Sequence, residues 1–218
     1  MQLQPHIISN IPVFKVSDSL KKVIKHFKES TFSHVAVIEN GIFLGVLNEN
    51  DVKNFDKDGT IDNFRYNLER IFVLQSASWL DVLEAFARNE ANLIPVIGEN
   101  GKVQGYYDIT DIVSVFNDTP FFTEPGSILV VAKGMKDYSF SEIAQIVESS
   151  NTRFIGGFIT DITNDVAQVT IKVGTANLND IIQTFRRYNY NVLFGNNDDQ
   201  FLEDLKQRSD YLDKYLNV

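Results

Sequence analysis

Hydrophobic and polar positions follow one pattern that occurs twice in the first half of the chain. Each copy opens with a short apolar segment, residues 11–16 and 71–75, which predicts a strand. Apolar residues at helical spacing come next: Leu20, Val23, Ile24 and Phe27 in the first copy, Leu80, Leu83, Phe86 and Ala87 in the second. Each copy then continues with two more strands joined by a turn, at Asn40-Gly41 in the first copy and at Asn100-Gly101 in the second. Asn-Gly favours the tightest hairpin turns. The pattern predicts a repeated strand-helix-strand-strand-helix unit.

The two copies align at an offset of 59 residues, which becomes 60 after one extra residue in the second turn. Val13 then corresponds to Phe72, Gly45 to Gly105 and Asp51 to Asp111. A last helix is expected over residues 51–55 and 111–116. About 45 residues bury too little surface to fold alone, so we expect the copies to pack sheet to sheet. Such packing would form two clefts related by a pseudo-twofold axis, within domains at 1–60 and 61–124.

The second half of the chain, residues 125–218, has a different order of elements. Strands are expected at 128–133, 153–162, 166–173 and 191–194, with amphipathic helices starting near Phe140 and Leu178. The order βαββαβ is a ferredoxin-like arrangement. Thr119 to Gly126 contains two prolines and predicts a linker. A last helix is expected near the C-terminus, and its apolar face would pack within the chain or on a second subunit: Phe201, Leu202, Leu205, Leu212, Tyr215 and Leu216.

Composition and charge restrict the function. The formal charge of −9 and the absence of a basic stripe argue against nucleic-acid and anionic-membrane partners. The chain has no cysteine, which excludes disulfides, thiolate metal sites and a Cys nucleophile. The N-terminus has no signal-peptide pattern, and the longest apolar run spans only residues 128–132, so a cytoplasmic location is expected.

No catalytic or metal-binding pattern is present in the sequence. The three histidines lack the spacing of a metal site, and His26 is expected on a helix surface. Neither a phosphate-binding glycine loop nor a Gly-x-Ser-x-Gly elbow occurs. We therefore expect no enzyme activity, no metal and no bound cofactor.

The repeated unit resembles the CBS domain, and the tandem copies resemble a Bateman module. The resemblance rests on two motifs in each copy: Val35-Ala36-Val37-Ile38 with Ile94-Pro95-Val96-Ile97, and Gly45-Val46-Leu47-Asn48-Glu49-Asn50-Asp51 with Gly105-Tyr106-Tyr107-Asp108-Ile109-Thr110-Asp111. In this family the closing motif ends in Ser or Thr, any two residues and Asp. The resemblance implies an adenine nucleoside or nucleotide ligand, with its ribose hydroxyls on Asp51 and Asp111.

Residues near the motifs complete the expected cleft. The resemblance places Val13, Phe72, His34, Val35, Ile94 and Pro95 beside the ligand. A carboxylate can accept both hydroxyls of a cis-diol; the alternative role for Asp51 and Asp111 is to cap the helices that follow them.

The sequence departs from the family at the Ser/Thr position, which holds Asn48 and Asp108. Asn48 keeps a donor for a phosphate, whereas Asp108 adds a second carboxylate beside Asp111 and disfavours a triphosphate. A nucleoside, a neutral ligand, a cation held by Asp108 and Asp111, and an empty cleft all remain open.

The second half resembles an ACT domain, and the combination is similar to the AcuB family, in which a CBS pair precedes ACT. Amino-acid-binding ACT domains carry Asp-Pro-Gly in the first strand-to-helix loop. Here Asp137 matches, but Tyr138 and Ser139 replace Pro-Gly, which makes close approach of the backbone to a ligand harder. The loop at Asp137 and Ser139 either binds an amino acid or serves dimerisation only.

The expected fold class is mixed α+β and α/β: a tandem CBS pair followed by a ferredoxin-like, ACT-like domain. Two functions follow. One is a cytoplasmic, non-enzymatic regulator that senses a small metabolite, an adenine nucleoside or nucleotide, in the CBS cleft. The other is a structural dimerising adaptor with vestigial clefts. Both imply a homodimer and an unknown protein target.

Overall fold

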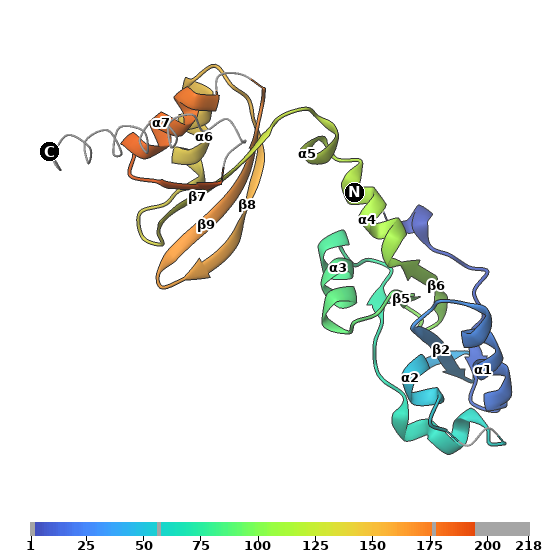
Figure 1. Cartoon of the computed structure of the whole chain (residues 1–218). Helices are drawn as coiled ribbons and strands as arrows, with labels where there is room; N and C mark the ends of the chain where they lie inside the picture. The colour runs from blue at the N-terminus through green and yellow to red at the C-terminus, as the bar shows by residue number, and fades with distance from the viewer. Residues whose placement is uncertain (1–2, 56–57, 176–177, 195–218) are drawn as a thin grey trace, which may run out of the picture. The chain divides into compact units, whose positions relative to one another are not determined.

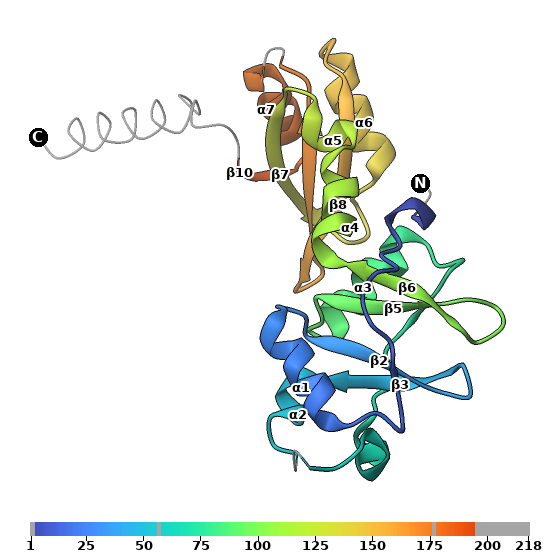
Figure 2. The same cartoon turned by 90° about the vertical axis from the view of Figure 1, so that its right-hand side faces the viewer.

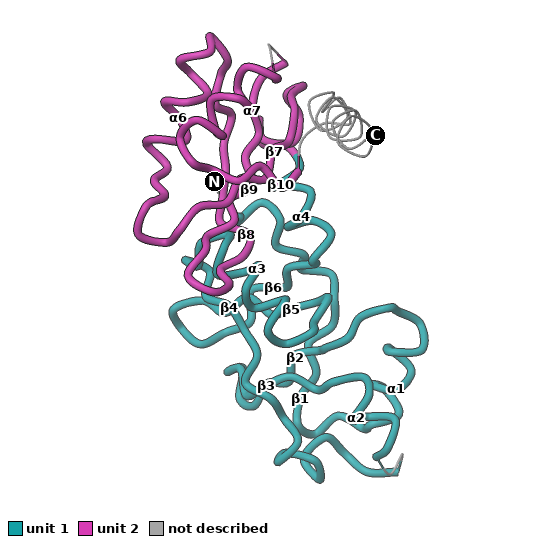
Figure 3. The backbone as a smooth tube through the Cα atoms, turned by 60° about the vertical axis from the view of Figure 1, so that its left-hand side comes forward, with its two compact units in different colours: residues 1–117 teal, residues 118–218 magenta. Residues whose placement is uncertain are grey.

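The structure is a computed structural model that describes residues 3–55, 58–175 and 178–194. The chain divides into two compact units, residues 1–117 and 118–218, coloured separately in Figure 3. No helix within the described ranges is long and apolar enough to cross a membrane. The predicted C-terminal helix at 201–216 lies outside the described residues.

The first unit contains the expected duplication. The first repeat consists of β1 (Phe14–Lys15), α1 (Leu20–Glu29), β2 (His34–Glu39), β3 (Ile42–Asn48) and α2 (Glu49–Val52). The second consists of β4 (Val73–Leu74), α3 (Trp79–Arg88), β5 (Leu93–Ile97), β6 (Val103–Asp108) and α4 (Ile109–Asn117). Short 3-10 helices, η1 (Gln4–His6) and η2 (Ile61–Asn67), precede each repeat. The sheet orders, β1-β2-β3 and β4-β5-β6, match in direction and register, with Phe14 opposite Val37 and Val73 opposite Val96.

The first strand of each repeat is shorter than the sequence predicts. Only Phe14–Lys15 and Val73–Leu74 pair within their own sheets, whereas strands were expected over 11–16 and 71–75. The residues just upstream pair with the other repeat instead. Ile8 forms a bridge to Tyr106 on β6, and Glu69 forms the equivalent bridge to Val46 on β3. Figure 2 shows the N-terminal segment running past β6 and β5 before it reaches the first repeat.

Gly45 and Gly105, at equivalent positions, make room for this strand exchange, in which the segment before each repeat pairs with the sheet of the other repeat. A Cβ on Gly105 would lie 2.5 Å from the Ile8 carbonyl oxygen, and one on Gly45 would lie 2.9 Å from that of Glu69. Gly105 also has φ of +150°, a conformation that side chains disfavour. Both glycines therefore keep space for a strand that belongs to the other repeat.

The two repeats share an apolar junction. Ile11, Ala36, Leu93 and Tyr106 form a buried cluster between them, and β2 lies beside β5 (Figure 2). Two further apolar clusters form the cores of the repeats, and the core of the second repeat also includes Leu3 and Val46.

The second unit has the element order βαββαβ. It consists of β7 (Ser127–Gly134), α6 (Phe140–Ser149), β8 (Phe154–Thr163), β9 (Val166–Val173), α7 (Leu178–Arg187) and β10 (Asn191–Phe194). The sheet order is β10-β7-β9-β8, with antiparallel neighbours throughout. Figure 1 shows α6 and α7 on one face of this sheet, over a core that includes Leu129, Ile171 and Phe185.

The predicted linker contains a short helix, α5 (Pro120–Thr123), that packs on the second unit. Lys172 points to the sheet face opposite Ile171, since neighbouring side chains of a strand alternate. Its ammonium group donates to the carbonyl oxygens of Phe121 at 2.5 Å and Phe122 at 3.4 Å. For this reason the compact unit begins at Asp118, earlier than the predicted boundary after residue 124.

Replacing Gly105 tests the strand exchange. We expect Gly105→Ala to lower the free energy of unfolding by about 3 kcal/mol, because the methyl group meets the Ile8 carbonyl and the backbone is strained. Gly41→Ala is the control: it has φ of +81° but no atom within 4 Å of an added Cβ. It should cost about 1 kcal/mol. Urea unfolding measures both, and equal losses would show that the crossing strand does not constrain Gly105.

Candidate ligand-binding site

The closing motifs of the two repeats end β3 and β6 and start the helices α2 and α4. Asn48 caps α2, its side chain accepting from the Asn50 amide at 2.9 Å. Asp108 occupies the same position in the second repeat and accepts from the Thr110 amide at 2.7 Å and from the Thr110 hydroxyl. The sequence-based alternative that Asp51 and Asp111 cap these helices is therefore wrong, and the helices begin earlier than predicted.

Asp51 and Asp111 lie in the first turns of α2 and α4. Both are partly buried, and neither carboxylate accepts a hydrogen bond or forms an ion pair within the described part of the chain. A carboxylate at a helix N-terminus is stabilised by the helix dipole without using its lone pairs. These two groups thus keep their acceptor capacity for an external donor.

Most of the other predicted cleft residues belong to the core. Val35 and Ile94 have no exposed surface, and Pro95 is also buried. Val35 and Ile94 pack in the core clusters of the first and second repeat, respectively. Val13 packs against that junction as well, and Phe72 is 41% exposed with its ring 5.5 Å from that of Phe43.

His34 is buried in a polar network instead of facing a ligand. Asn48 uses its oxygen on its own helix, so its Nδ2 donates to His34 Nε2 at 3.3 Å. His34 Nδ1 therefore carries the proton and donates to Ser33 Oγ at 2.7 Å. Burial lowers the pKa of His34, while the nearby charge of Asp51 raises it less. Asn48 is accordingly engaged on both sides, which weakens its expected role as a phosphate donor.

A reciprocal pair of hydrogen bonds joins the repeats where their central strands begin. The Ser33 amide donates to Asn92 Oδ1 at 2.7 Å, and the Asn92 amide donates to Ser33 Oγ at 2.9 Å. The two residues are equivalent at the 59-residue offset, so the pair lies on the pseudo-twofold axis. The sequence analysis did not predict this hydrogen-bonded pair. A short polar residue just before the apolar central strand of each repeat could have indicated it.

Tyr106 breaks the symmetry of the repeats. Its hydroxyl donates to the Pro12 carbonyl at 2.8 Å and accepts from the Ala36 amide at 3.0 Å. The equivalents of Tyr106 and Ala36 are Val46 and Pro95, which have neither the hydroxyl nor the amide hydrogen. Burial raises the pKa of Tyr106, so the phenol stays protonated and satisfies both groups.

An internal polar cluster lies beside the predicted loop site of the second unit. Ser139 caps α6, accepting from the Glu142 amide at 3.3 Å, and Asp137 is exposed. Glu142 accepts from Lys133 Nζ at 2.8 Å and from the Tyr190 hydroxyl at 2.7 Å, and these bonds lower the pKa of Glu142. The polar groups beside Ser139 are thus satisfied within the chain.

Within the described residues, no group of three His, Asp or Glu side chains gathers closely enough to hold a metal ion. In the suggested Asp108–Asp111 pair, Oδ1 of the Asp108 carboxylate accepts hydrogen bonds from Thr110.

Comparison with known families gives the repeats their name. Residues 6–58 and 68–118 each match the family model of the CBS domain. The first unit is a CBS domain pair. The matched segments start before β1 and β4 and end after the closing motifs, so they include the exchanged strands and both first-turn aspartates.

Solved structures with a CBS pair show low sequence identity to the chain. A CBS domain pair/ACT domain protein from Thermotoga maritima is 18% identical, with 53% of this chain and 96% of that chain covered, at a TM-score of 0.48. The CBS domains of a transcriptional regulator from Streptococcus pneumoniae are 17% identical, with 52% and 98% covered, at 0.46. CBSX2 in complex with AMP is 16% identical, with 53% and 95% covered, at 0.44. A search of curated proteins found no match.

His26 in the CBS pair was expected on a helix surface, and the structure leaves its side chain only partly exposed. Its ring lies among those of Phe14, Phe27 and Phe32, with centroids 5.8, 6.1 and 6.1 Å away. Its Nε2 is buried without a hydrogen-bond partner, and burial lowers the pKa of His26.

Partly buried His26 and buried His34 predict a pH-dependent stability. Because both pKa values are lowered in the fold, the unfolded chain binds protons first as the pH falls through 6.5, the ordinary histidine value. The free energy of unfolding should therefore fall between about pH 7.5 and about pH 5.5, above the range in which carboxylates titrate. Urea unfolding at both pH values measures the loss.

His26→Phe should make this pH dependence smaller, since a phenyl ring suits the aromatic site and takes no proton. Lys25→Gln on the same helix is the control and should leave it unchanged. A stability that does not vary over this interval would contradict the burial of both imidazoles.

Proposed function

We propose that the CBS pair is a cytoplasmic, non-enzymatic regulatory module that binds an adenine nucleoside or nucleotide. The observation that carries the proposal is the equivalent placement of Asp51 and Asp111, partly buried in the first helical turns with unused acceptor capacity. The caps at Asn48 and Asp108 free them for this role. A ribose cis-diol supplies two donors to one carboxylate.

The electrostatics of the two sites support different ligands. At Asp111 the neighbouring Asp108 adds negative charge, which favours an uncharged nucleoside over a triphosphate. At Asp51 the equivalent neighbour is the neutral Asn48, which adds no second negative charge. A nucleotide is better tolerated there. CBSX2, which shares the domain, was crystallised with AMP, but the proposal rests on the carboxylates of this chain.

Titration calorimetry with adenosine, AMP and ATP tests the ligand assignment. Asp111→Asn should weaken adenosine binding, and Asp51→Asn should weaken AMP binding, each by about tenfold or more, because a charge-assisted hydrogen bond is lost. Asp180→Asn, which changes a first-turn acid of α7, should have no effect.

Two outcomes would count against the assignment. If no adenine compound binds, the adaptor function becomes the better explanation. If binding persists unchanged in both aspartate variants, the ribose does not lie on these carboxylates.

The adaptor function has one observation in its favour: the cleft side chains Val35, Ile94 and Pro95 are buried. Both functions share the proposal of a homodimer. For the second unit, whose order βαββαβ suits a ferredoxin-like fold, we propose an ACT-like role in dimerisation rather than amino-acid binding. The polar cluster of Lys133, Glu142 and Tyr190 supports this, since these three side chains bond to one another.

The helix face of the second CBS domain is a suitable dimer surface. Leu80 is 60% exposed and Val113 41%, and Leu83 and Ile109 lie beside them on α3 and α4. The residues of the first domain that correspond to Leu80 and Val113 are Lys21 and Lys53, so the first domain is charged at these two positions. An apolar patch on one domain fits an isologous contact, in which the same patch of two copies meets.

Light scattering with size exclusion tests this contact. We expect a dimer at micromolar concentration and a monomer for Leu80→Glu combined with Val113→Glu, because four carboxylates would be buried at the twofold contact. Leu74→Glu, at a residue 51% exposed on the edge strand β4, is the control and should stay dimeric. A monomeric parent protein, or a double variant that remains dimeric, would refute this interface.

A further inference from the structure

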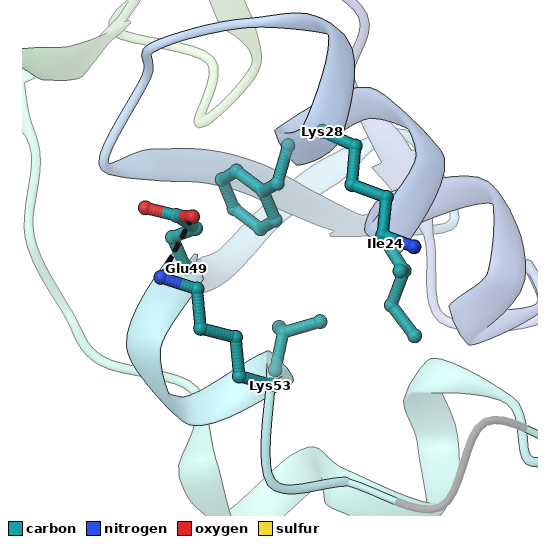
Figure 4. Close-up of a pocket in the computed structure, with 6 residues that line it drawn as sticks. Ile24, Lys28, Glu49 and Lys53 are labelled. Carbon is teal, nitrogen blue, oxygen red and sulfur yellow. Dashed lines mark ion pairs between the residues drawn. The ribbon is translucent and has the colours of Figure 1, made fainter.

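A pocket of about 170 Å³ lies between α1 and α2 of the first CBS domain. It is lined by Ile24, Phe27, Lys28, Glu49, Val52 and Lys53. Figure 4 shows Ile24 and Lys28 on one side, from α1, and Glu49 and Lys53 on the other, from α2. Phe27 and Val52 are buried, whereas both lysines are exposed. The pocket therefore has an apolar floor and a charged rim, and it does not include the proposed ribose acceptor Asp51.

The two lysines of the rim differ in their partners. Lys53 Nζ lies 2.9 Å from Glu49 Oε1, so this ammonium group is already neutralised by a carboxylate. Lys28 has no ion pair or hydrogen bond to its side chain among the described residues. Lys28 thus leaves one uncompensated positive charge at the rim, in a chain whose formal charge is −9.

The second CBS domain shows that this rim is specific to the first. At the repeat offsets, Lys28 corresponds to Ala87, Glu49 to Ile109 and Lys53 to Val113. The floor positions are apolar in both domains: Phe86 and Ile112 of the second domain correspond to Phe27 and Val52 of the first. The fold itself therefore does not require charged residues at these positions, since the same helix pair packs in the second domain without them.

Pocket size and charge together define the ligand. A cavity of about 150 Å³ holds benzene, so this pocket has room for an apolar body of about six heavy atoms. An adenine nucleoside needs more, since pockets for such ligands span about 300–1,000 Å³. We infer that the α1–α2 pocket binds a small carboxylic acid, with its compact apolar body on Phe27 and Val52 and its carboxylate on the Lys28 ammonium group.

Benzoate is a suitable probe of this site, and benzyl alcohol is its neutral counterpart of nearly the same shape. Heteronuclear NMR of the full chain should show benzoate-dependent shifts of the methyl groups of Ile24 and Val52 that saturate at millimolar concentration. Benzyl alcohol should bind about tenfold more weakly, because it makes no charge-assisted bond to Lys28. Equal affinity for the two probes, or no saturable shift at these methyl groups, would overturn the inference.

Two variants and a control separate the charge from the cavity. Lys28→Met should weaken benzoate binding about tenfold and leave benzyl alcohol binding unchanged. Ile24→Phe should weaken both probes by occupying the pocket. Lys25→Met, on the same helix but outside the pocket, should change neither.

Thermal unfolding confirms that each variant is folded before the titrations are compared. Benzoate affinity that is unchanged in Lys28→Met would refute the carboxylate assignment. Because the pocket does not include Asp51 or Asp111, this result is independent of adenosine binding.

Discussion

The exchange of strand segments between the two CBS domains is the constraint on which the first unit depends. Ile8 pairs with β6 of the second domain, and Glu69 pairs with β3 of the first. Each sheet is thus completed by residues that precede the other domain's first strand, so neither domain is complete alone. Gly45 and Gly105 lie directly under these crossings, where a Cβ would collide with the crossing backbone. Backbone pairing of this kind holds the repeats in one arrangement and fixes where the two closing motifs lie.

Several equivalent positions of the two CBS domains carry side chains of different polarity. Tyr106 supplies a phenol at the junction that satisfies the Ala36 amide, while its equivalent Val46 needs none because Pro95 has no amide hydrogen. The helix faces differ in the same way, with lysines on the first domain and exposed leucine and valine on the second. A duplicated fold can therefore offer one polar and one apolar surface, since each copy needs only the common core residues to pack.

The second unit depends on alternation along its strands. Leu129 and Ile171 face the helices, whereas Lys172 faces α5 on the opposite side. Near the predicted ligand loop, Lys133, Glu142 and Tyr190 bond to one another, so these three polar groups are used within the chain. Side chains that stabilise the end of β7 and the start of α6 thereby restrict what the loop can bind.

The sequence by itself determined the duplication, the strand and helix order and the position of the CBS motifs, because periodicity and Asn-Gly turns are local signals. It did not determine which residues cap the helices, or that Val35, Ile94 and Pro95 are buried. Asn48 and Asp108 cap by geometry that depends on where the strands end. Only the tertiary structure brought Ser33 to Asn92, placed His26 beside three aromatic rings and formed the α1–α2 pocket. Those features arise from residues far apart in the chain, and their packing leaves no periodic trace in the sequence.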